Sequence, residues 1–410
     1  MTVIQKGDYM LGLNSITTLL VACILFLIGE LIVTKVGIFR RLVIPGPVIG
    51  GLIFAIAVAI LQTTGVVTIK LDTKFFQSFF MLAFFTTIGL GASFKLLKMG
   101  GALLIIYWIC AAVLAIFQNV IGVSLAKVLH IDPLLGLTAG SMSMEGGHGN
   151  AAAYGQTLVN QGVDSALTAA LAAATLGLVA GGLLGGPVVK FLINKYNLKP
   201  LDANAETKDY SKLNRNEFLH RRFNTTQIFL IQFTIIIFCM AVGTYLGNLF
   251  TSQTGTNIPV YVGAMFVAVI LRNIFEVVKL PVIDIKLTDQ ISTVSLSLFL
   301  SLALMSIKLT EVYHLALPLF VIVFAQVVFI ILFSIFVIFR ILGKDYDAAV
   351  MIGGFIGHGL GATPNAMANL DAITRKYGAS PKAYLIVPIV GAFLIDVVSV
   401  PIITWFINNF

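Results

Sequence analysis

The amino-acid sequence predicts an all-α polytopic membrane protein built from two inverted-topology repeats of five transmembrane helices, each with a glycine-rich re-entrant hairpin. Three observations predict this fold class: long apolar segments, two halves that match each other, and one broken glycine-rich segment in each half. The chain of 410 residues is 58% hydrophobic and only 11% charged. A soluble domain carries about 25% charged residues. We therefore expect a lipid bilayer around most of this chain.

Ten apolar segments predict the spans, since about twenty apolar residues cross a bilayer. In the first half they cover residues 15–34, 47–67, 76–94, 101–125 and 166–192, and in the second half 226–250, 259–271, 291–307, 315–339 and 383–406. The segment 259–271 is short for a span. One long polar segment separates the halves, so we expect an N-terminal membrane repeat at 1–193, a cytoplasmic linker at 194–224 and a C-terminal membrane repeat at 225–410.

Lysine and arginine predict the orientation, because they favour the cytoplasmic side of a membrane. With the N-terminus outside, only Lys6, Lys70, Lys74, Lys127 and Lys308 of the 26 basic residues lie outside. We therefore expect both termini outside and the central loop in the cytoplasm. This distribution explains the net charge of +8 without a nucleic-acid partner. The sequence also lacks a basic face with interleaved aromatic residues, which a nucleic-acid-binding protein would be expected to have.

The two halves match at a nearly constant offset. The shared positions are Gly, Pro, Asn and Asp, which match by chance less readily than Leu or Val. They pair Pro45 with Pro259, Asp132 with Asp347, Asn150 with Asn365, Gly177 with Gly391 and Pro187 with Pro401, at offsets of 214 to 215. With five spans per half, the second half must be inverted relative to the first. Inverted repeats with broken elements at corresponding positions are typical of secondary transporters.

The glycine-rich segments 133–155 and 348–370 are predicted to be re-entrant hairpins, tolerated only where protein or a wet cavity surrounds them. In the second hairpin, Gly354, Gly357, Gly359 and Gly361 favour an unwound chain over a continuous helix. Thr363 is then expected to cap a helix that has Pro364 in its first turn. The N-terminus of such a helix suits an anion.

Several hairpin residues offer hard oxygen ligands of the kind that Na⁺ prefers. They are Ser141, Ser143, Asn150, Thr363 and Asn365. Packing and helix capping remain the alternative role for this set. His148 and His358 each lie between glycines. Two interpretations remain open for each histidine: contact with substrate or a proton, or a purely structural role as a hydrogen-bonded residue. The sequence has no His, Glu and Cys spacing typical of zinc.

Two acidic residues are expected at membrane depth, where ionisable side chains are costly and commonly functional. Asp396 lies within the last apolar segment and is predicted to coordinate a cation. Glu145 lies in the first hairpin, where a watery mouth is the alternative to an ion site. Gln118 and Asn119 face either neighbouring helices or substrate, and the sequence leaves this open.

Several motifs resemble those of the bacterial sodium/glutamate symporter family, and the resemblance covers nearly the whole chain. They are Met81-Leu82-Ala83-Phe84-Phe85-Thr86-Thr87-Ile88-Gly89-Leu90, Gly146-Gly147-His148-Gly149, Gly343-Lys344-Asp345-Tyr346-Asp347-Ala348-Ala349, Gly359-Leu360-Gly361-Ala362-Thr363-Pro364 and the run from Val387-Pro388 to Asp396. The resemblance implies a non-enzymatic transporter of a bacterial cytoplasmic (inner) membrane, with two inverted five-span halves and hairpins at the translocation site. It also implies a homodimer and Na⁺-coupled uptake of L-glutamate by alternating access.

On this basis two sets of site residues are expected. The substrate set is Ser143, Gly147, His148, Gly149, Asn150, His358, Gly361, Thr363 and Asn365, and the Na⁺ set is Ser141, Glu145, Thr363 and Asp396. Glu145 departs from the family pattern, in which a small or hydroxyl residue is common at this position. An acidic side chain is unfavourable near a dicarboxylate. A Na⁺- or H⁺-coupled symporter of another organic anion or amino acid is therefore the alternative. A cation antiporter is a further alternative, because inverted repeats with broken segments also serve ion exchange.

Overall fold

The computed structural model describes residues 3–5, 8–37, 39, 45–64, 67–200, 219, 222–254, 259–306 and 315–410. Within these residues, ten helices are long and apolar enough to cross a membrane, which confirms the expected polytopic helical class. They are α1 (Ser15–Lys35), α3 (Gly46–Thr63), α4 (Lys74–Gly91), α5 (Phe94–Val128), α9 (Ala166–Tyr196), α11 (Thr225–Thr254), α12 (Val260–Val277), α13 (Ile285–Met305), α14 (Ala316–Phe333) with η4 (Ser334–Ile338) and α15 (Phe339–Ile341), and α18 (Pro381–Ile389) with η5 (Val390–Leu394) and α19 (Ile395–Asn409). Most of the expected linker lies outside the described residues.

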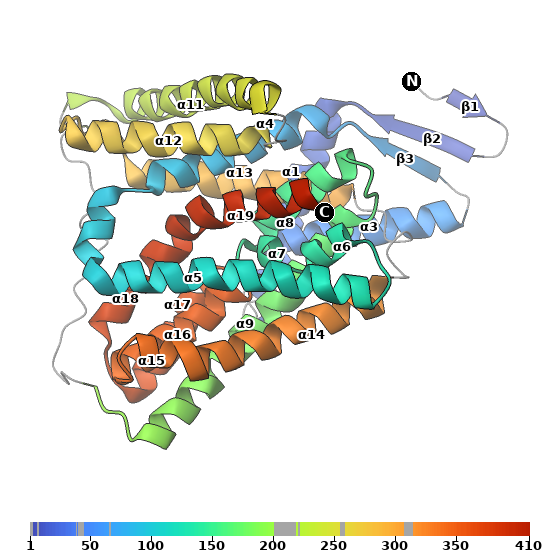
Figure 1. Cartoon of the computed structure of the whole chain (residues 1–410). Helices are drawn as coiled ribbons and strands as arrows, with labels where there is room; N and C mark the ends of the chain where they lie inside the picture. The colour runs from blue at the N-terminus through green and yellow to red at the C-terminus, as the bar shows by residue number, and fades with distance from the viewer. Residues whose placement is uncertain are drawn as a thin grey trace.

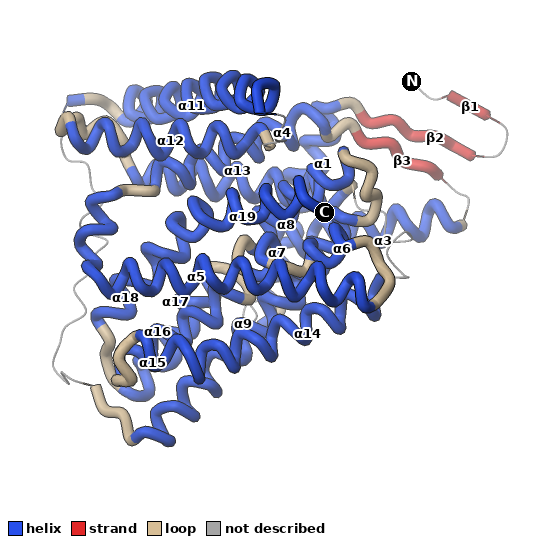
Figure 2. The backbone as a smooth tube through the Cα atoms, in the orientation of Figure 1, coloured by secondary structure: helices blue, strands red, loops and turns tan. Residues whose placement is uncertain are grey.

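A small β-sheet is present that the sequence analysis did not predict (Figure 2). Strand β2 (Asp8–Leu13) pairs antiparallel with β1 (Val3–Gln5) and parallel with β3 (Val67–Leu71). The second span was therefore predicted too long, because α3 ends at Thr63 and Val67 begins β3. The alternation of apolar and polar side chains from Val67 to Leu71 is the period of a strand, which a count of apolar residues does not detect.

The helices pack in two groups (Figure 1). The first group consists of α1, α3, α4, α11, α12 and α13, with its main contacts between α4 and α12, α11 and α12, α4 and α13, and α1 and α3. The second group holds α5, α9 and α14 to α19, together with three shorter helices: α6 (Pro133–Thr138), α7 (Ser141–Met144) and α8 (Gly147–Asn160). Each half of the chain gives three helices to the first group.

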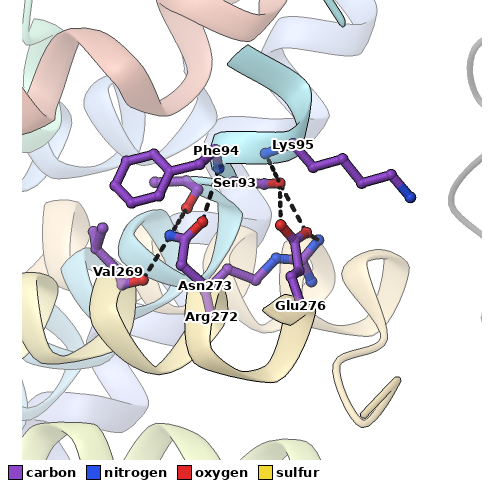
Figure 3. A network of polar contacts seen from close by, with 8 residues as sticks. Ser93, Phe94, Lys95, Val269, Arg272, Asn273 and Glu276 are labelled. Atoms are coloured by element: carbon purple, nitrogen blue, oxygen red, sulfur yellow. Dashed lines mark hydrogen bonds and ion pairs between the residues drawn. The ribbon is translucent and has the colours of Figure 1, made fainter. Parts of the chain in front are cut away.

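The chain passes from the first group to the second between α4 and α5, and a polar network fixes this junction on α12 (Figure 3). The Ser93 hydroxyl lies 2.7 Å from both carboxylate oxygens of Glu276. Asn273 accepts from the Phe94 amide at 2.8 Å and donates to the Ala92 carbonyl at 2.9 Å. The sequence analysis ended this span at residue 271, but α12 continues to Val277. The prediction failed because polar side chains that have hydrogen-bond partners, such as Asn273 and Glu276, are tolerated within a membrane helix.

Candidate functional site

Both segments that were expected to be broken are interrupted helices in the second group. In the first, Glu145 and Gly146 separate α7 from α8. In the second, residues 360–362 separate α16 (Tyr346–Gly359) from α17 (Thr363–Tyr377). Helices α8 and α17 both begin at these breaks without a hydrogen bond from a capping side chain. The positive ends of their dipoles therefore face the breaks. In α17, Pro364 has no N–H group and the Asn365 N–H donates to the Ala362 carbonyl at 3.0 Å, so this N-terminus offers a ligand mainly its dipole and the backbone of Thr363.

The two breaks meet at Gly147 and Gly361. A Cβ atom at Gly147 would lie 2.8 Å from the carbonyl oxygen of Gly361, and the φ angle of Gly147 is +57°. Both the close approach and the left-handed backbone therefore require glycine at Gly147. Two long helices line the same junction, because Gly177 of α9 approaches the Leu360 carbonyl and Gly391 of η5 approaches the Thr363 hydroxyl. Segments more than 200 residues apart thus form one site.

The glycines of the second hairpin do not unwind it as predicted. Gly354, Gly357 and Gly359 lie inside the continuous helix α16, and only residues 360–362 leave the helix. A Cβ atom at Gly357 would lie 2.5 Å from the Cα atom of Ala366, and one at Gly354 would lie 2.6 Å from Val387. These glycines allow close helix packing, as small residues commonly do in membrane proteins.

Thr363 does not cap α17, contrary to the prediction. Ala362 is the capping residue and has no side-chain hydrogen bond to make, whereas Thr363 is the first helical residue. A Cβ atom at Gly391 would lie 3.1 Å from the Thr363 hydroxyl oxygen. The threonine hydroxyl thus lies against η5 of the last membrane span. Pro364 favours the first turn of α17 without help from a capping side chain.

Asn150 and Asn365 form matching cross-links between the halves. The Asn150 side chain donates from Nδ2 to Oδ1 of Asp396 at 2.6 Å, and the Asn365 side chain donates from Nδ2 to the Leu178 carbonyl at 2.6 Å. Both asparagines are buried, and Oδ1 of each has no hydrogen-bond partner in the described part of the chain. Asp396 is 8% exposed. An unpaired buried oxygen is costly, so these oxygens mark places where a ligand or ion would be stabilised.

Glu145 is the second buried carboxyl group at the junction. It is 4% exposed, and neither carboxylate oxygen has a partner among the described residues. No lysine or arginine is buried in the described part of the chain. The charge of an anionic substrate must therefore be balanced by backbone dipoles, amides, hydroxyls and ions instead of a basic side chain.

The two histidines are held by polar residues that the sequence analysis did not identify. The His358 Nε2 atom lies 2.8 Å from the Tyr107 hydroxyl, and the His148 Nε2 atom lies 3.0 Å from the Thr175 hydroxyl. In the regions that the structure describes, no three His, Cys, Asp or Glu side chains gather as a metal site. Tyr107 and Thr175 lie in apolar helices, where a polar side chain needs a hydrogen-bond partner. A polar residue in an apolar segment was therefore the sequence signal that could have identified them.

Three further candidates have packing or hydrogen-bonding roles. The backbone N–H and the hydroxyl of Ser141 both donate to Asn119 Oδ1, at 2.8 and 2.9 Å. The Ser143 hydroxyl donates to the carbonyls of Thr138 and Ala170. A Cβ atom at Gly149 would lie 2.8 Å from the Phe84 ring. Gln118, whose role was left open, donates to the Gly359 carbonyl at 2.7 Å.

Two interrupted helices meet here, with unpaired buried amide and carboxyl oxygens near their breaks, and the described residues include ten helices long and apolar enough to cross a membrane. This combination is typical of the class of secondary transporters. The sequence model of the sodium/glutamate symporter family matches residues 11–379, and this chain belongs to that family. It is 38% identical to the sodium/glutamate symporter of Escherichia coli (strain K12) over 395 residues, which cover 96% of this chain and 97% of that protein. It is 39% identical over 383 residues to the sodium/glutamate symporter of Haemophilus influenzae, covering 93% of this chain and 94% of the relative.

Proposed function

We propose that this protein takes up L-glutamate together with Na⁺ by alternating access. The contact between the two helix breaks at Gly147 and Gly361 carries the proposal, because it brings two open helix N-termini and a buried carboxyl group to one place. Family membership supplies the identity of substrate and ion. An anion and a cation bound together lower each other's electrostatic cost in the membrane interior.

The substrate carboxylates are proposed to bind at the N-termini of α8 and α17. Gly147, Gly149 and Gly361 allow the required close packing. The unpaired side-chain oxygens of Asn150 and Asn365 beside the breaks are acceptors, so they suit the ammonium group of the substrate or Na⁺ instead of a carboxylate. His148 and His358 complete the wall. Ser143 is proposed to support this wall indirectly, since its hydroxyl already donates to two carbonyls. Helix N-termini are well suited to carboxylates where no basic side chain is buried.

Na⁺ is proposed to bind at the Asp396 carboxylate. Ser399 follows Asp396 by three residues in α19, and its buried hydroxyl has no partner among the described residues. Asn150, which contacts Asp396 through Nδ2, has an unpaired Oδ1 atom. Carboxylate, amide and hydroxyl oxygens are suitable ligands for a hard cation. Thr363 remains a further candidate ligand, whereas the hydroxyl of Ser141 is occupied by Asn119.

The two halves are proposed to be inverted repeats, and α6 to α8 and α16 to α17 to be re-entrant hairpins. Equivalent contacts in the two halves support this proposal. Asn150 and Asn365, which are 215 positions apart, each donate to a long helix of the opposite half. Gly177 approaches Met144 and Gly391 approaches His358, and both pairs are related by an offset of 214. This arrangement is typical of transporters with a site near the bilayer midplane.

A homodimer in the bacterial inner membrane, with both termini outside and the central loop inside, completes the proposal. The excess of Lys and Arg on the predicted inner side supports the orientation. Lys127, predicted to lie outside, has its Nζ atom 4.7 Å from the ring centroid of Phe410, the last residue. Exposed apolar side chains such as Leu20, Leu27 and Leu31 of α1 suit lipid or a second protomer.

Uptake of labelled L-glutamate into proteoliposomes that contain the purified protein tests the function. An inward Na⁺ gradient is compared with an equal K⁺ gradient and with protein-free liposomes. Accumulation above the external concentration only with Na⁺ is expected. Uptake by folded protein that is equal under both gradients would contradict Na⁺ coupling, and no uptake under either would contradict glutamate as the substrate.

A further inference from the structure

Glu145 is a buried carboxyl group to which the transport site described above gives no role. It follows α7 directly and precedes Gly146, so it lies at the break where α8 begins. Its side chain is 4% exposed, and neither Oε1 nor Oε2 has a hydrogen-bond partner in the described chain. A buried polar group without a partner is costly whether it is charged or neutral, so a carboxyl group kept here without a partner indicates that a bound group completes it.

The surroundings of Glu145 contain no cation that could complete it. Asp396 and the Tyr107 hydroxyl both act on Glu145 electrostatically, and neither is positively charged. No lysine or arginine is buried in the described residues. Glu145 also belongs to no group of three metal-ligating side chains within the described regions. The partners that would stabilise a charged Glu145 therefore have to come from the molecules that the site binds.

Two cations are available in the proposed function, Na⁺ and the ammonium group of the amino acid. Asp396 has two neighbours with unpaired oxygens: Asn150, which contacts its carboxylate through Nδ2, and Ser399, which lies three residues further along α19. The carboxylate, the Asn150 amide oxygen and the Ser399 hydroxyl together offer a mixed oxygen set for a metal ion. Glu145 offers only its two carboxylate oxygens and lies beside the N-terminus of α8. A substrate carboxylate held at that N-terminus would present its α-ammonium group, a triple donor, within reach of the neighbouring residue.

We propose that Glu145 binds the α-ammonium group of the substrate and thereby makes the site prefer an α-amino acid over a dicarboxylate without an amino group. This inference rests on the proposed function and replaces the ion-ligand role expected for Glu145. It also removes the apparent conflict of an acidic side chain beside a dicarboxylate. The carboxylates lie at the helix N-termini, the ammonium group neutralises Glu145, and Na⁺ neutralises Asp396.

Competition between L-glutamate and glutarate tests the inference, because glutarate keeps both carboxylates and lacks the amino group. Both compounds compete with labelled L-glutamate for Na⁺-driven uptake by the wild type and by Glu145→Gln. In the variant, we expect the half-inhibitory concentration of L-glutamate to rise about 10- to 100-fold, the range for a lost charge-assisted hydrogen bond. That of glutarate should stay the same or fall, so the preference for glutamate disappears.

Glu30→Gln is the matched control, since Glu30 is another glutamate in a membrane helix and lies against Gly46, outside the site. It should keep the preference. Glu145→Asp, which retains a carboxylate, should keep part of it. If Glu145→Gln does not transport, the same competition is measured as ligand-dependent thermal stabilisation of the purified protein.

Two results would overturn the inference: an unchanged ratio of the two half-inhibitory concentrations in Glu145→Gln, or equal weakening of both compounds. The failure of the proposed function itself would be separate and visible, because the wild type would then show no Na⁺-dependent glutamate uptake. The inference would fall with it.

Discussion

The two asparagine sites of this protein have the same framework and different surroundings. Asn150 donates to the carboxylate of Asp396, whereas Asn365 donates to the Leu178 carbonyl. The residue that corresponds to Asp396 at the repeat offset of 214 is Gly182, and a Cβ atom there would lie 3.7 Å from the Asn365 Nδ2 atom. One asparagine thus faces an acidic side chain and the other faces backbone and a glycine.

This difference assigns different ligands to two similar places. A carboxylate beside an unpaired amide oxygen suits Na⁺, while a glycine beside an open helix N-terminus leaves room for a substrate carboxylate and adds no negative charge. We propose on this basis that the two equivalent places serve different ligands, a cation beside Asn150 and an anion beside Asn365. The following substitutions either remove or exchange this asymmetry, in order of decreasing effect on transport.

Asp396→Asn should have the largest effect. Removing the carboxylate takes away the only charged ligand proposed for Na⁺, so Na⁺-driven glutamate uptake should fall at least about 100-fold, as expected for the loss of a strong charged interaction. Uptake is measured in proteoliposomes, with size-exclusion chromatography as the control for folding. Retained uptake with the wild-type dependence on Na⁺ concentration would exclude Asp396 as an ion ligand.

Gly182→Asp places a carboxylate at the position equivalent to Asp396. Because space is available there, the protein should fold, but the new charge should repel the substrate at α17 and raise the KM for glutamate about tenfold or more, with the KM for Na⁺ less affected. Gly182→Ala is the matched control and should be close to the wild type, since its Cβ would make an ordinary contact of 3.7 Å. Equal effects of alanine and aspartate would mean that packing, not charge, matters at Gly182.

Asn150→Ala and Asn365→Ala sharpen the comparison by separating the ligands. The first should mainly raise the Na⁺ concentration needed for half-maximal uptake, and the second should mainly raise the KM for glutamate, each by roughly 5- to 20-fold for a lost hydrogen bond or ion ligand. The measurement is a matrix of initial rates over both concentrations. Identical changes in the two variants would show that the sites are not specialised in this way.

Asn273→Ala tests a region far from both sites and should affect stability more than transport. The substitution leaves the backbone groups of Ala92 and Phe94 without their partner, at a cost of about 1 to 3 kcal/mol. Thermal unfolding of the purified protein should begin at a lower temperature, while the KM for glutamate stays the same. An altered KM with unchanged thermal stability would instead connect this junction to the transport cycle.

The sequence predicted the parts of this structure that depend on regular patterns. Hydropathy located ten helices, and the matching positions located both breaks and the pair of asparagines. Local propensity failed where tertiary contacts decide. Gly354 and Gly357 are helical because close packing requires them, and Thr363 does not cap because its hydroxyl lies against Gly391. The partners of Ser141 and His358 come from helices distant in sequence, which no local pattern encodes.

The dependence of glutamate affinity on Na⁺ tests the central claim most directly, because binding sites that neutralise each other must be coupled. The dissociation constant of L-glutamate for the purified protein would be measured by calorimetry in Na⁺ and in choline at equal ionic strength. We predict that glutamate binds about tenfold or more tightly in Na⁺, and that Asp396→Asn removes this difference. Equal affinity of the wild type in Na⁺ and in choline would contradict a Na⁺ site coupled to the glutamate site.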